Sequence, residues 1–165
     1  MLKFNYMVKC VMCFLIKEYE GKIDKICLAQ TKTQKDKIGS GMLNTYGGKV
    51  EQGEAILDAV ARELHEESSV KVNKDNLQKV GILKFPTLNI ISYIYKTNTW
   101  QGSPKDSKDG EMTNPKWYSF NEIPFNKMWD CDKYWYPLMF QNRYFEGEIH
   151  YNKNSLTSKI NLDII

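Results

Sequence analysis

The chain has 165 residues, of which 42% are hydrophobic and 26% are charged, and its formal net charge is +3. This length suits one domain with a substantial core, and the composition is that of an ordinary globular protein. The weak positive charge argues against a stable nucleic-acid partner. The first apolar run, 8–16, is shorter than the roughly 20 residues that cross a membrane. We therefore expect one soluble domain over residues 1–165.

The four cysteines do not form the even, closely spaced pattern of a disulfide framework. Cys10 and Cys13 are three residues apart, so on a strand their side chains point to opposite faces. The sequence offers no second cysteine pair or histidine cluster to complete a zinc site. We expect free, buried or half-buried thiols in a reducing compartment, the cytoplasm or the nucleus.

The first half of the chain predicts a β-hairpin, a loop, a strand–turn element and a helix. These are strands at 8–16 and 25–30 around a turn at Gly21, a loop at 31–41, a strand–turn at 44–50 and a helix at about 55–68. Within the helix, apolar residues recur at i, i+3, i+4 and i+7. They are Leu57, Val60, Ala61 and Leu64. This stripe predicts that the helix packs on a sheet.

The second half predicts more strands and one further helix. Strands are expected at 77–85, 90–97 and 116–120, a charged loop at 105–110, a helix at 128–143 and a closing hairpin at 144–151 and 156–162. Pro137 lies inside the second helix, where it would break or kink it. The alternation of strands with two helices indicates a mixed α/β protein.

Glu63, Glu66 and Glu67 are spaced at i, i+3 and i+4, so a helix brings their carboxylates within about one turn of one another. Like charges this close destabilise an isolated helix by roughly 0.2–0.5 kcal/mol per pair. A divalent cation between the acids removes that repulsion, and carboxylate oxygens are the ligands that Mg²⁺ prefers. The spacing predicts a magnesium site, against the alternative of an ordinary solvated acidic helix face.

The segment just before this helix carries groups that suit a phosphate ligand. Gly47 and Gly48 allow the backbone to approach a ligand closely, and Lys49 adds a cation for a phosphate. Arg62 lies two helical turns beyond Glu54, so the two side chains meet only if Glu54 lies outside the helix. We expect that pair to brace the loop against the helix.

Together, the glycine, the acids and the arginine resemble the Nudix box, the signature of the Nudix hydrolase family. The match runs from Gly48 through Glu54 to Arg62 and the three acids that follow it. Every defining position agrees except the last glycine, which is Ser69 here. If that position needs a positive φ, a serine costs about 1 kcal/mol there.

The resemblance implies an α/β/α sandwich with a central mixed sheet and two main helices, in which water attacks a phosphoanhydride with the help of a metal ion. It implies Mg²⁺, with Mn²⁺ as an alternative ion. The residues that it assigns to the metal and to catalysis are Gly47 (through its carbonyl), Arg62, Glu63, Glu66, Glu67 and Glu111. One of the box glutamates, or Glu111, would then deprotonate or orient the water.

The C-terminal half is similar to the oxidised-purine nucleoside triphosphatase branch of the same family, which degrades 8-oxo-dGTP and 2-oxo-dATP to monophosphate and pyrophosphate. The similarity lies in residues 110–112, Trp117 and 122–138, and Asn44 before Tyr46 agrees with it. By this resemblance the substrate-binding residues are Asn44, Tyr46, Gly47, Gly48, Lys49, Met112, Trp129, Asp130, Cys131 and Asp132.

These residue types suit a purine pocket. Trp129 offers a flat face for stacking, and Asn44 can donate and accept hydrogen bonds at a base edge. After the tryptophan the branch has proline and two adjacent aspartates, whereas this chain has Asp130, Cys131 and Asp132. A buried Asp132 would have a raised pKa and could donate a proton to the base.

Two alternatives stay open. Cys131 in place of an aspartate is compatible with a Nudix hydrolase of another nucleotide, such as an ordinary dNTP, a diadenosine polyphosphate or an mRNA cap. A non-catalytic nucleotide sensor is the second alternative, although such descendants usually lose box acids and this chain keeps them. We expect a monomer that binds a purine nucleoside triphosphate and has no nucleic-acid or membrane partner.

Overall fold

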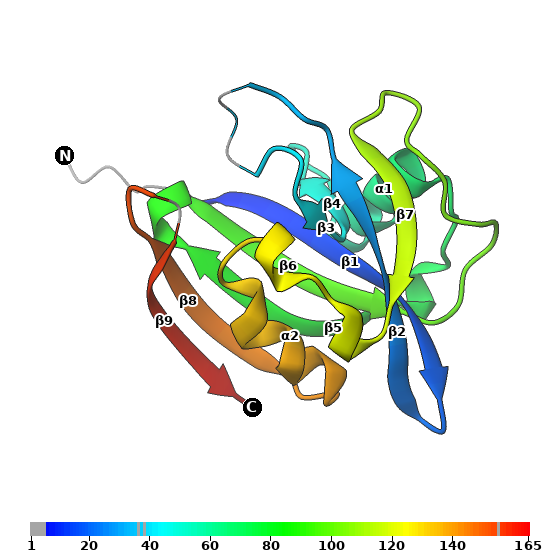
Figure 1. The fold of residues 1–165 in the computed structure, drawn as a ribbon. Coiled ribbons are helices and arrows are strands. Elements are labelled where there is room, and N and C mark those ends of the chain that lie inside the picture. Colours follow the sequence, from blue (N-terminus) through cyan, green and yellow to red (C-terminus); the bar gives the residue numbers. More distant parts are fainter. Residues whose placement is uncertain (1–5, 36, 38, 155) are drawn as a thin grey trace.

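A nine-stranded mixed sheet forms the centre of the computed structural model, which describes residues 6–35, 37, 39–154 and 156–165 (Figure 1). The strands are β1 (Val8–Tyr19), β2 (Lys22–Thr31), β3 (Leu43–Asn44), β4 (Tyr46–Lys49), β5 (Gln78–Phe85), β6 (Ile90–Thr97), β7 (Met112–Tyr118), β8 (Phe145–Tyr151) and β9 (Thr157–Ile164). Their order is β3-β2-β1-β6-β5-β8-β9, while β4 pairs with β1 and β7 with β2. The pairs β1–β6 and β5–β8 are parallel and the others antiparallel.

The two helices, α1 (Ile56–Ser68) and α2 (Asp132–Phe140), cover opposite faces of this sheet (Figure 1). Successive side chains of a strand point to opposite faces, and β1 follows that rule. Phe14 is buried in the core beneath α2, whereas Leu15 is buried in the core beneath α1. The predicted α/β/α sandwich with a mixed sheet is therefore confirmed.

Helix α1 starts one residue later than predicted, and its buried stripe differs from the predicted one. Val60 and Leu64 are buried as expected, but Leu57 is 37% exposed and Ala61 is only half-buried. Ala59 and Ser68 are buried instead. The apolar stripe is rotated because Glu63 and Glu67 also lie against the sheet rather than fully in water. The two acids therefore face inward, while Glu66 is exposed.

Helix α2 is shorter than the predicted 128–143. The chain before it forms short 3₁₀ turns, among them Phe125–Lys127, and the helix begins only at Asp132. Asn142 has a φ of 55°, a left-handed conformation that ends a helix. Pro137 lies inside the nine-residue helix. The remaining 3₁₀ turns are Lys74–Asn76, Pro86–Leu88 and Phe120–Glu122.

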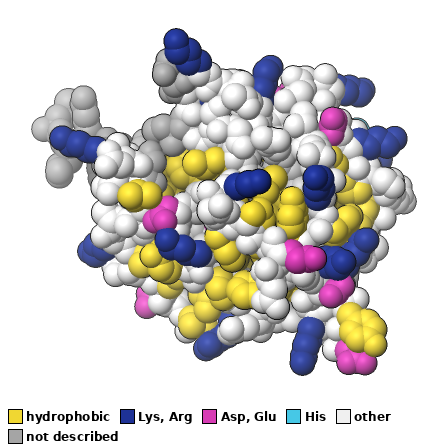
Figure 2. Space-filling view, viewed as in Figure 1, with side chains coloured by type: hydrophobic (Ala, Val, Ile, Leu, Met, Phe, Trp, Pro, Cys, Tyr) yellow, Lys and Arg dark blue, Asp and Glu magenta, His cyan; other side chains and the backbone are white. Residues whose placement is uncertain are grey.

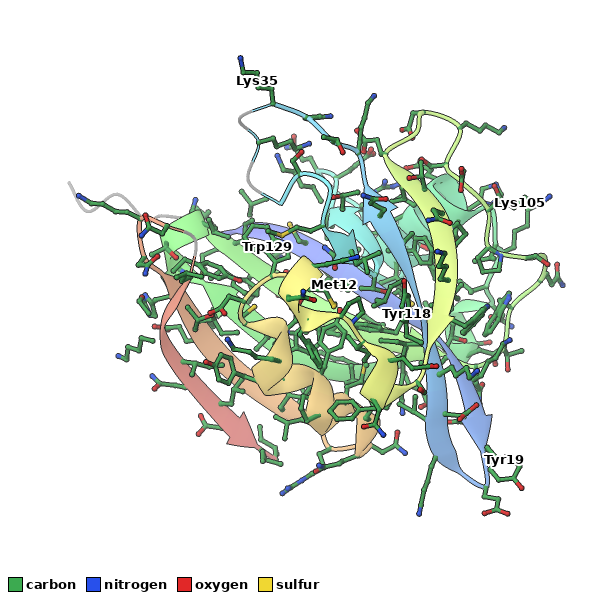
Figure 3. All side chains as sticks on the ribbon, viewed as in Figure 1. Met12, Tyr19, Lys35, Lys105, Tyr118 and Trp129 are labelled. Atoms are coloured by element: carbon green, nitrogen blue, oxygen red, sulfur yellow. The ribbon has the colours of Figure 1, made fainter. Side chains whose placement is uncertain are left out.

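The predicted hairpin around Gly21 is confirmed, and its strands are longer than expected. Glu20 and Gly21 have φ values of 51° and 73°, which matches the two-residue turns that connect twisted antiparallel strands. Because the turn is so tight, β1 continues to Tyr19 and β2 begins at Lys22. The hairpin projects from the sheet, with Tyr19 at its tip (Figure 3).

The surface and the cysteines agree with the expectations from composition. Lys and Arg side chains are scattered among hydrophobic ones over the face shown in Figure 2. Cys10, Cys13, Cys27 and Cys131 are all free thiols. Within the described ranges, no helix combines the length and the apolar character that a membrane span requires.

Candidate functional site

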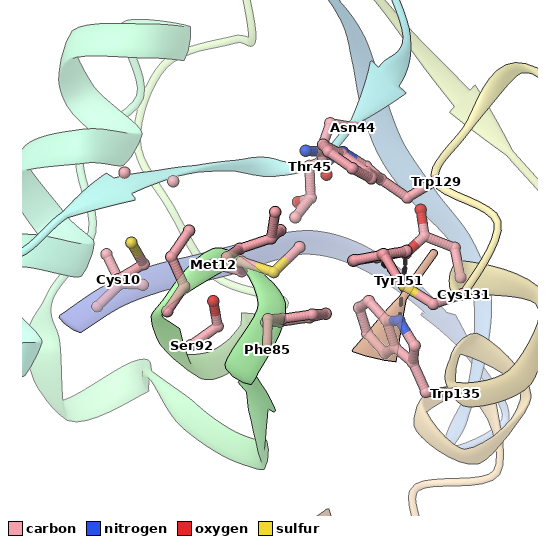
Figure 4. A pocket seen from close by; sticks show the side chains of 16 residues that line it. Cys10, Met12, Asn44, Thr45, Phe85, Ser92, Trp129, Cys131, Trp135 and Tyr151 are labelled. Carbon is pink, nitrogen blue, oxygen red and sulfur yellow. Dashed lines mark hydrogen bonds between the residues drawn. The ribbon is translucent and has the colours of Figure 1, made fainter. Parts of the chain in front are cut away.

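A largely apolar cavity of about 210 Å³ opens between the start of α2 and the strands β1, β4, β5, β6 and β8 (Figure 4). Trp129 and Asn44 lie along one edge of it (Figure 4). Its apolar lining includes Met12, Phe85, Leu88, Ile90 and Trp135. We call it the α2 cavity. An apolar space with few polar groups suits an aromatic ring system.

Asp132 is the acidic group of the α2 cavity, and it is only 3% exposed. Its Oδ1 accepts a hydrogen bond from Trp135 Nε1 at 3.1 Å. Its Oδ2 is buried and has no hydrogen-bond partner among the described residues. Burial raises the pKa of Asp132 to about 7. The cavity thus contains a carboxyl group that can donate a proton or accept one, with a free oxygen for a ligand.

Cys131, beside Asp132, pairs with a tyrosine from β8. Its Sγ lies 2.9 Å from the Tyr151 hydroxyl oxygen, and both side chains line the α2 cavity. Burial raises the pKa of the Cys131 thiol, which therefore stays neutral. Tyr151 in turn lies 5.5 Å from the Trp129 ring, centroid to centroid. Among the described residues that line the cavity, Asp132 therefore supplies the one carboxyl group, and a neutral thiol–hydroxyl pair lies beside it.

A second, more polar cavity of about 220 Å³ adjoins the first, because Asn44 and Trp129 line both. We call it the acidic cavity, since Glu67 and Glu111 line it. Lys32 and Lys37 line it as well. The backbone N–H of Lys32 donates to the Glu111 carbonyl at 2.8 Å, which holds these two segments together. Acids and lysines around one space suit a metal ion together with a polyphosphate.

Two of the box acids lie against the paired glycines of β4. Glu67 Oε2 accepts a hydrogen bond from the Gly47 N–H at 2.8 Å. A Cβ atom added to Gly48 would lie 2.5 Å from Glu63 Oε1, so a larger residue there would displace that carboxylate. Burial, together with the negative charges of Glu63 and Glu111, raises the pKa of Glu67 to about 8. This cluster of partly buried acids needs a positive charge.

Arg62 supplies some of that charge and ties the helix to the preceding loop. Its Nε and Nη2 donate to the two oxygens of Glu54 at 2.8 and 3.0 Å, a bidentate pair. Its Nη1 donates to Glu63 at 2.8 Å and to Glu66 at 3.1 Å. Arg62 lowers the pKa of Glu54 to about 2. Glu54 lies just outside α1, as the predicted brace requires.

Comparison with known proteins gives the family. Residues 8–139 match the NUDIX domain. The chain belongs to the Nudix family. It is 35% identical over 130 residues to the oxidized purine nucleoside triphosphate hydrolase of Danio rerio. These aligned residues cover 76% of this chain and 80% of that protein. It is 38% identical over 119 residues to the Mus musculus protein of the same name. These residues cover 69% of this chain and 72% of that protein.

A structural likeness supports the fold. The crystal structure of a MutT protein from Bacillus halodurans superposes with a TM-score of 0.75 and covers 95% of this chain and 98% of that one. The identity is 23%, so this likeness bears on the fold alone. Ser69, which stands where the Nudix box resemblance expects its last glycine, is the C-cap of α1. Its φ is 64°, a left-handed conformation that a glycine adopts without strain.

The donor set of the Nudix box fits a hard divalent cation, although its carboxylates are not gathered around one point. Among the described residues, no three His, Cys, Asp or Glu side chains are arranged to hold a metal ion. Glu63 and Glu67 converge on Gly47 and Gly48, while Glu66 is drawn outward to Arg62. Oxygen donors and an excess of negative charge around the half-buried Glu67 suit a hard divalent cation such as Mg²⁺ or Mn²⁺.

Some of the residues expected to bind substrate lie elsewhere. Tyr46 is fully buried in the α1 core, with its hydroxyl 3.5 Å from Cys27 Sγ, because alternation along β4 turns it away from Gly47. Lys49 is exposed and lines neither cavity. Asp130 also lines neither, since its carboxylate accepts from Lys133 at 2.6 Å and from the Thr157 N–H at 2.9 Å. Met112 lines the acidic cavity rather than the α2 cavity.

The α2 cavity includes residues that the sequence did not single out. Met12 and Ser92 come from the neighbouring parallel strands β1 and β6, and Tyr151 comes from β8. In the sequence, these positions have the pattern of buried strand residues. The sequence predicts only which residues of one strand lie on the same face of the sheet, because side chains alternate along a strand. Lys32 and Lys37 lie in a segment that was expected to be only a loop.

Proposed function

We propose that this Nudix protein hydrolyses oxidised purine nucleoside triphosphates, such as 8-oxo-dGTP and 2-oxo-dATP, to the monophosphate and pyrophosphate. The observation that carries the proposal is the junction of the two cavities at Trp129 and Asn44. A purine in the α2 cavity would direct its phosphates toward the acids of the box. Relatives from two vertebrates that carry the name of this activity support it.

In the α2 cavity, Trp129 would stack on the purine and Asp132 would read its edge. Oxidation of a purine changes which of its edge atoms donate and which accept hydrogen bonds. A carboxyl group with a pKa near neutral can serve either pattern, because it donates when protonated and accepts when ionised. Its unpartnered Oδ2 is the oxygen left for this contact. Asn44 would add an amide that donates and accepts.

At the other end, Glu63, Glu66, Glu67 and the Gly47 carbonyl would hold Mg²⁺ or Mn²⁺, with Glu111 beside them. When bound, the ion polarises phosphoryl oxygens and lowers the pKa of a bound water. Glu111 or a box glutamate would orient the attacking water. Arg62 would keep Glu63 in place, and Lys32 and Lys37 would face the polyphosphate tail. The protein would act as a single-domain monomer on free nucleotides in the cytoplasm or nucleus.

The test is a comparison of kcat/KM for 8-oxo-dGTP, 2-oxo-dATP, dGTP and a cap analogue with Mg²⁺. We expect pyrophosphate release and a clear preference for the two oxidised purines. Turnover without that preference would favour the second candidate, a Nudix hydrolase of another nucleotide, to which Cys131 in place of a carboxylate points. Nucleotide binding without any turnover would identify a sensor and overturn the proposal.

A further inference from the structure

The Tyr151 hydroxyl is held at the α2 cavity by a thiol, which is a weak hydrogen-bonding partner. The hydroxyl oxygen lies 2.9 Å from Cys131 Sγ, and the same Sγ lies 3.7 Å from Asp132 Oδ1. All three residues line the cavity (Figure 4). Sulfur is a weak acceptor of hydrogen bonds. The hydroxyl proton of Tyr151 would therefore form a stronger hydrogen bond by turning from Sγ to an oxygen atom of a ligand.

The ring of Tyr151 is fixed by its neighbours, so its hydroxyl has a defined position. The ring stacks on Phe85 with an interplanar angle of 2° and a centroid distance of 6.1 Å. Trp129 packs against it at an angle of 44°. The Tyr151 backbone N–H donates to Thr87 Oγ1 at 3.1 Å. A side chain held in this way loses little further freedom when its hydroxyl binds a ligand.

Other polar groups of the α2 cavity are already committed to protein partners. The Thr45 hydroxyl donates to the Cys13 carbonyl at 2.6 Å. Asn44 Oδ1 accepts from the Thr45 N–H at 2.8 Å, which leaves the amide N–H groups of Asn44 for a ligand. Asp132 can donate only when it is protonated. Burial raises the pKa of the Tyr151 hydroxyl, so this group stays a neutral donor whatever the state of Asp132.

We propose that Tyr151 is a specificity-determining residue of this site, whose hydroxyl donates a hydrogen bond to a carbonyl oxygen of the bound purine. Cys131 is its positioning residue. The proposal rests on the proposed function, because it requires a purine in the α2 cavity. A carboxylate in place of Cys131 would add a second acceptor, whereas the thiol and the hydroxyl together supply a donor. Oxidised purines carry one carbonyl more than the unoxidised bases, so a donor beside the base favours them.

A purely structural role is the competing explanation for the pair of Tyr151 and Cys131. The hydroxyl and the thiol satisfy each other in a buried place, and both side chains belong to the core beneath α2. In that case, loss of the hydroxyl would change the stability of the protein, and any effect on binding would be the same for every base. The two explanations therefore differ in which nucleotides lose affinity.

The experiment is a calorimetric titration of the wild type and of Tyr151→Phe with 8-oxo-dGMP, 8-oxo-dAMP and dGMP, in EDTA so that no metal ion contributes. The variant keeps the stacked ring and removes only the hydroxyl. We expect it to bind 8-oxo-dGMP about three- to tenfold more weakly, as for the loss of one hydrogen bond. A similar loss for dGMP but not for 8-oxo-dAMP, which has an amino group at C6, identifies the C6 carbonyl as the acceptor. A loss for both 8-oxo nucleotides but not for dGMP identifies the C8 carbonyl.

A double-mutant cycle tests the role of Cys131. Cys131→Ala should weaken the binding of 8-oxo-dGMP in the wild type and have little effect in Tyr151→Phe, because the thiol acts through the hydroxyl. Equal effects in the two backgrounds would show that Cys131 does not position Tyr151. The control Tyr134→Phe removes the hydroxyl of an exposed tyrosine of α2 that lines neither cavity, and it should bind normally.

Unchanged affinity in Tyr151→Phe, or an equal loss for all three nucleotides, would refute the contact. Either result is compatible with pyrophosphate release from 8-oxo-dGTP by the wild type, so the proposed function would stand. A wild type that binds 8-oxo-dGMP but releases no pyrophosphate would instead overturn the proposed function, and the base contact would stand. A wild type that binds none of the three nucleotides would overturn both.

Discussion

The acidic cavity and the α2 cavity each contain a carboxyl group with a raised pKa, but the surroundings of the two groups differ. Glu67 in the acidic cavity, with a pKa of about 8, has Glu63, Glu111 and Asp109 around it, and their charges add to the effect of burial. Asp132 in the α2 cavity, with a pKa of about 7, is shifted by burial among apolar groups. A bound cation would stabilise the ionised carboxylate of Glu67. A proton, or the hydrogen-bonding edge of a neutral base, would stabilise the carboxyl group of Asp132. One region is thus suited to a metal ion and the other to a base.

The largest expected effect is the loss of catalysis in Glu67→Gln. If Glu67 holds the metal ion, the change removes a charged ligand that stabilises the transition state by several kcal/mol, and kcat should fall by about 10² to 10³-fold. The hydrogen bond from Gly47 can be kept by the amide oxygen, so the fold should stay intact. Steady-state kinetics with Mg²⁺, alongside circular dichroism, measures both.

Glu51→Gln is the matched control for that variant, because Glu51 is an exposed acid just before α1 that lines neither cavity. It should retain kcat. If the two variants have equal activity, Glu67 is not a metal ligand. The proposed contrast between the two cavities would then be wrong.

The next effect is on base selectivity, and it separates two neighbouring aspartates. Asp132→Ala should lower kcat/KM for oxidised purines by about 10- to 100-fold, since a hydrogen bond to a charged group contributes roughly 1.5–3 kcal/mol. Most of the loss should appear in KM. Asp130→Ala should leave selectivity unchanged, because Asp130 is held by Lys133 and Thr157 outside the cavity. If Asp130→Ala has the larger effect, the assignment of the base contact to Asp132 is wrong.

A smaller effect concerns stability and pH. Because burial raises the pKa of Asp132 from 3.8 to about 7, the folded state binds this proton more tightly than the unfolded state does. This group therefore lowers the free energy of unfolding as pH rises from about 4 to 7. Asp132→Asn cannot ionise, so its free energy of unfolding should not fall in this way. Between pH 4.5 and 8 the variant should gain about 1–2 kcal/mol in free energy of unfolding relative to the wild type. This gain is smaller than the full pKa shift would give, because water can enter the cavity.

Urea unfolding at several pH values measures the difference between the two proteins. Asp130→Asn is the contrasting case, since the hydrogen bond from Lys133 lowers the pKa of Asp130 and its contribution is lost as pH falls instead. Parallel pH profiles for wild type and Asp132→Asn would show that Asp132 is ionised in the folded protein at all of these values.

The acidic side of the site could be predicted from the sequence, because its geometry is local. Glu63 and Glu67 lie on one helix. Arg62, on the same helix, donates a hydrogen bond to Glu54, which lies just before the start of α1. Helical spacing alone therefore places the acids on neighbouring turns. The same spacing misjudged Leu57, because a stripe chosen from apolar residues ignores that two acids also turn toward the sheet.

The α2 cavity was less predictable, because its walls come from strands far apart in the chain. Met12 and Tyr151 are brought together by the parallel pairings β1–β6 and β5–β8, which no spacing within one strand specifies. Tyr46 could have been placed correctly, since alternation along β4 puts it on the opposite face from Gly47. The neighbours Asp130 and Asp132 differ because the first turn of α2 buries only the second.

The smallest expected effect concerns the C-terminal end of α1. It tests whether that end determines the position of Glu66 and Glu67. Ser69 has a φ of 64° and a ψ of 7°, and its N–H donates to the His65 carbonyl at 2.9 Å, so it closes the helix in a left-handed conformation. Ser69→Gly removes the strain on Cβ and should raise the free energy of unfolding by about 1 kcal/mol. Ser68→Gly, one residue earlier within the helix, should lower it, because glycine disfavours the helix and the buried Ser68 hydroxyl loses its hydrogen bond to the Leu64 carbonyl. Because both changes leave Glu67 in place, kcat should follow neither shift. A stabilised Ser69→Gly protein with altered kcat would instead mean that the serine tunes the position of the acids.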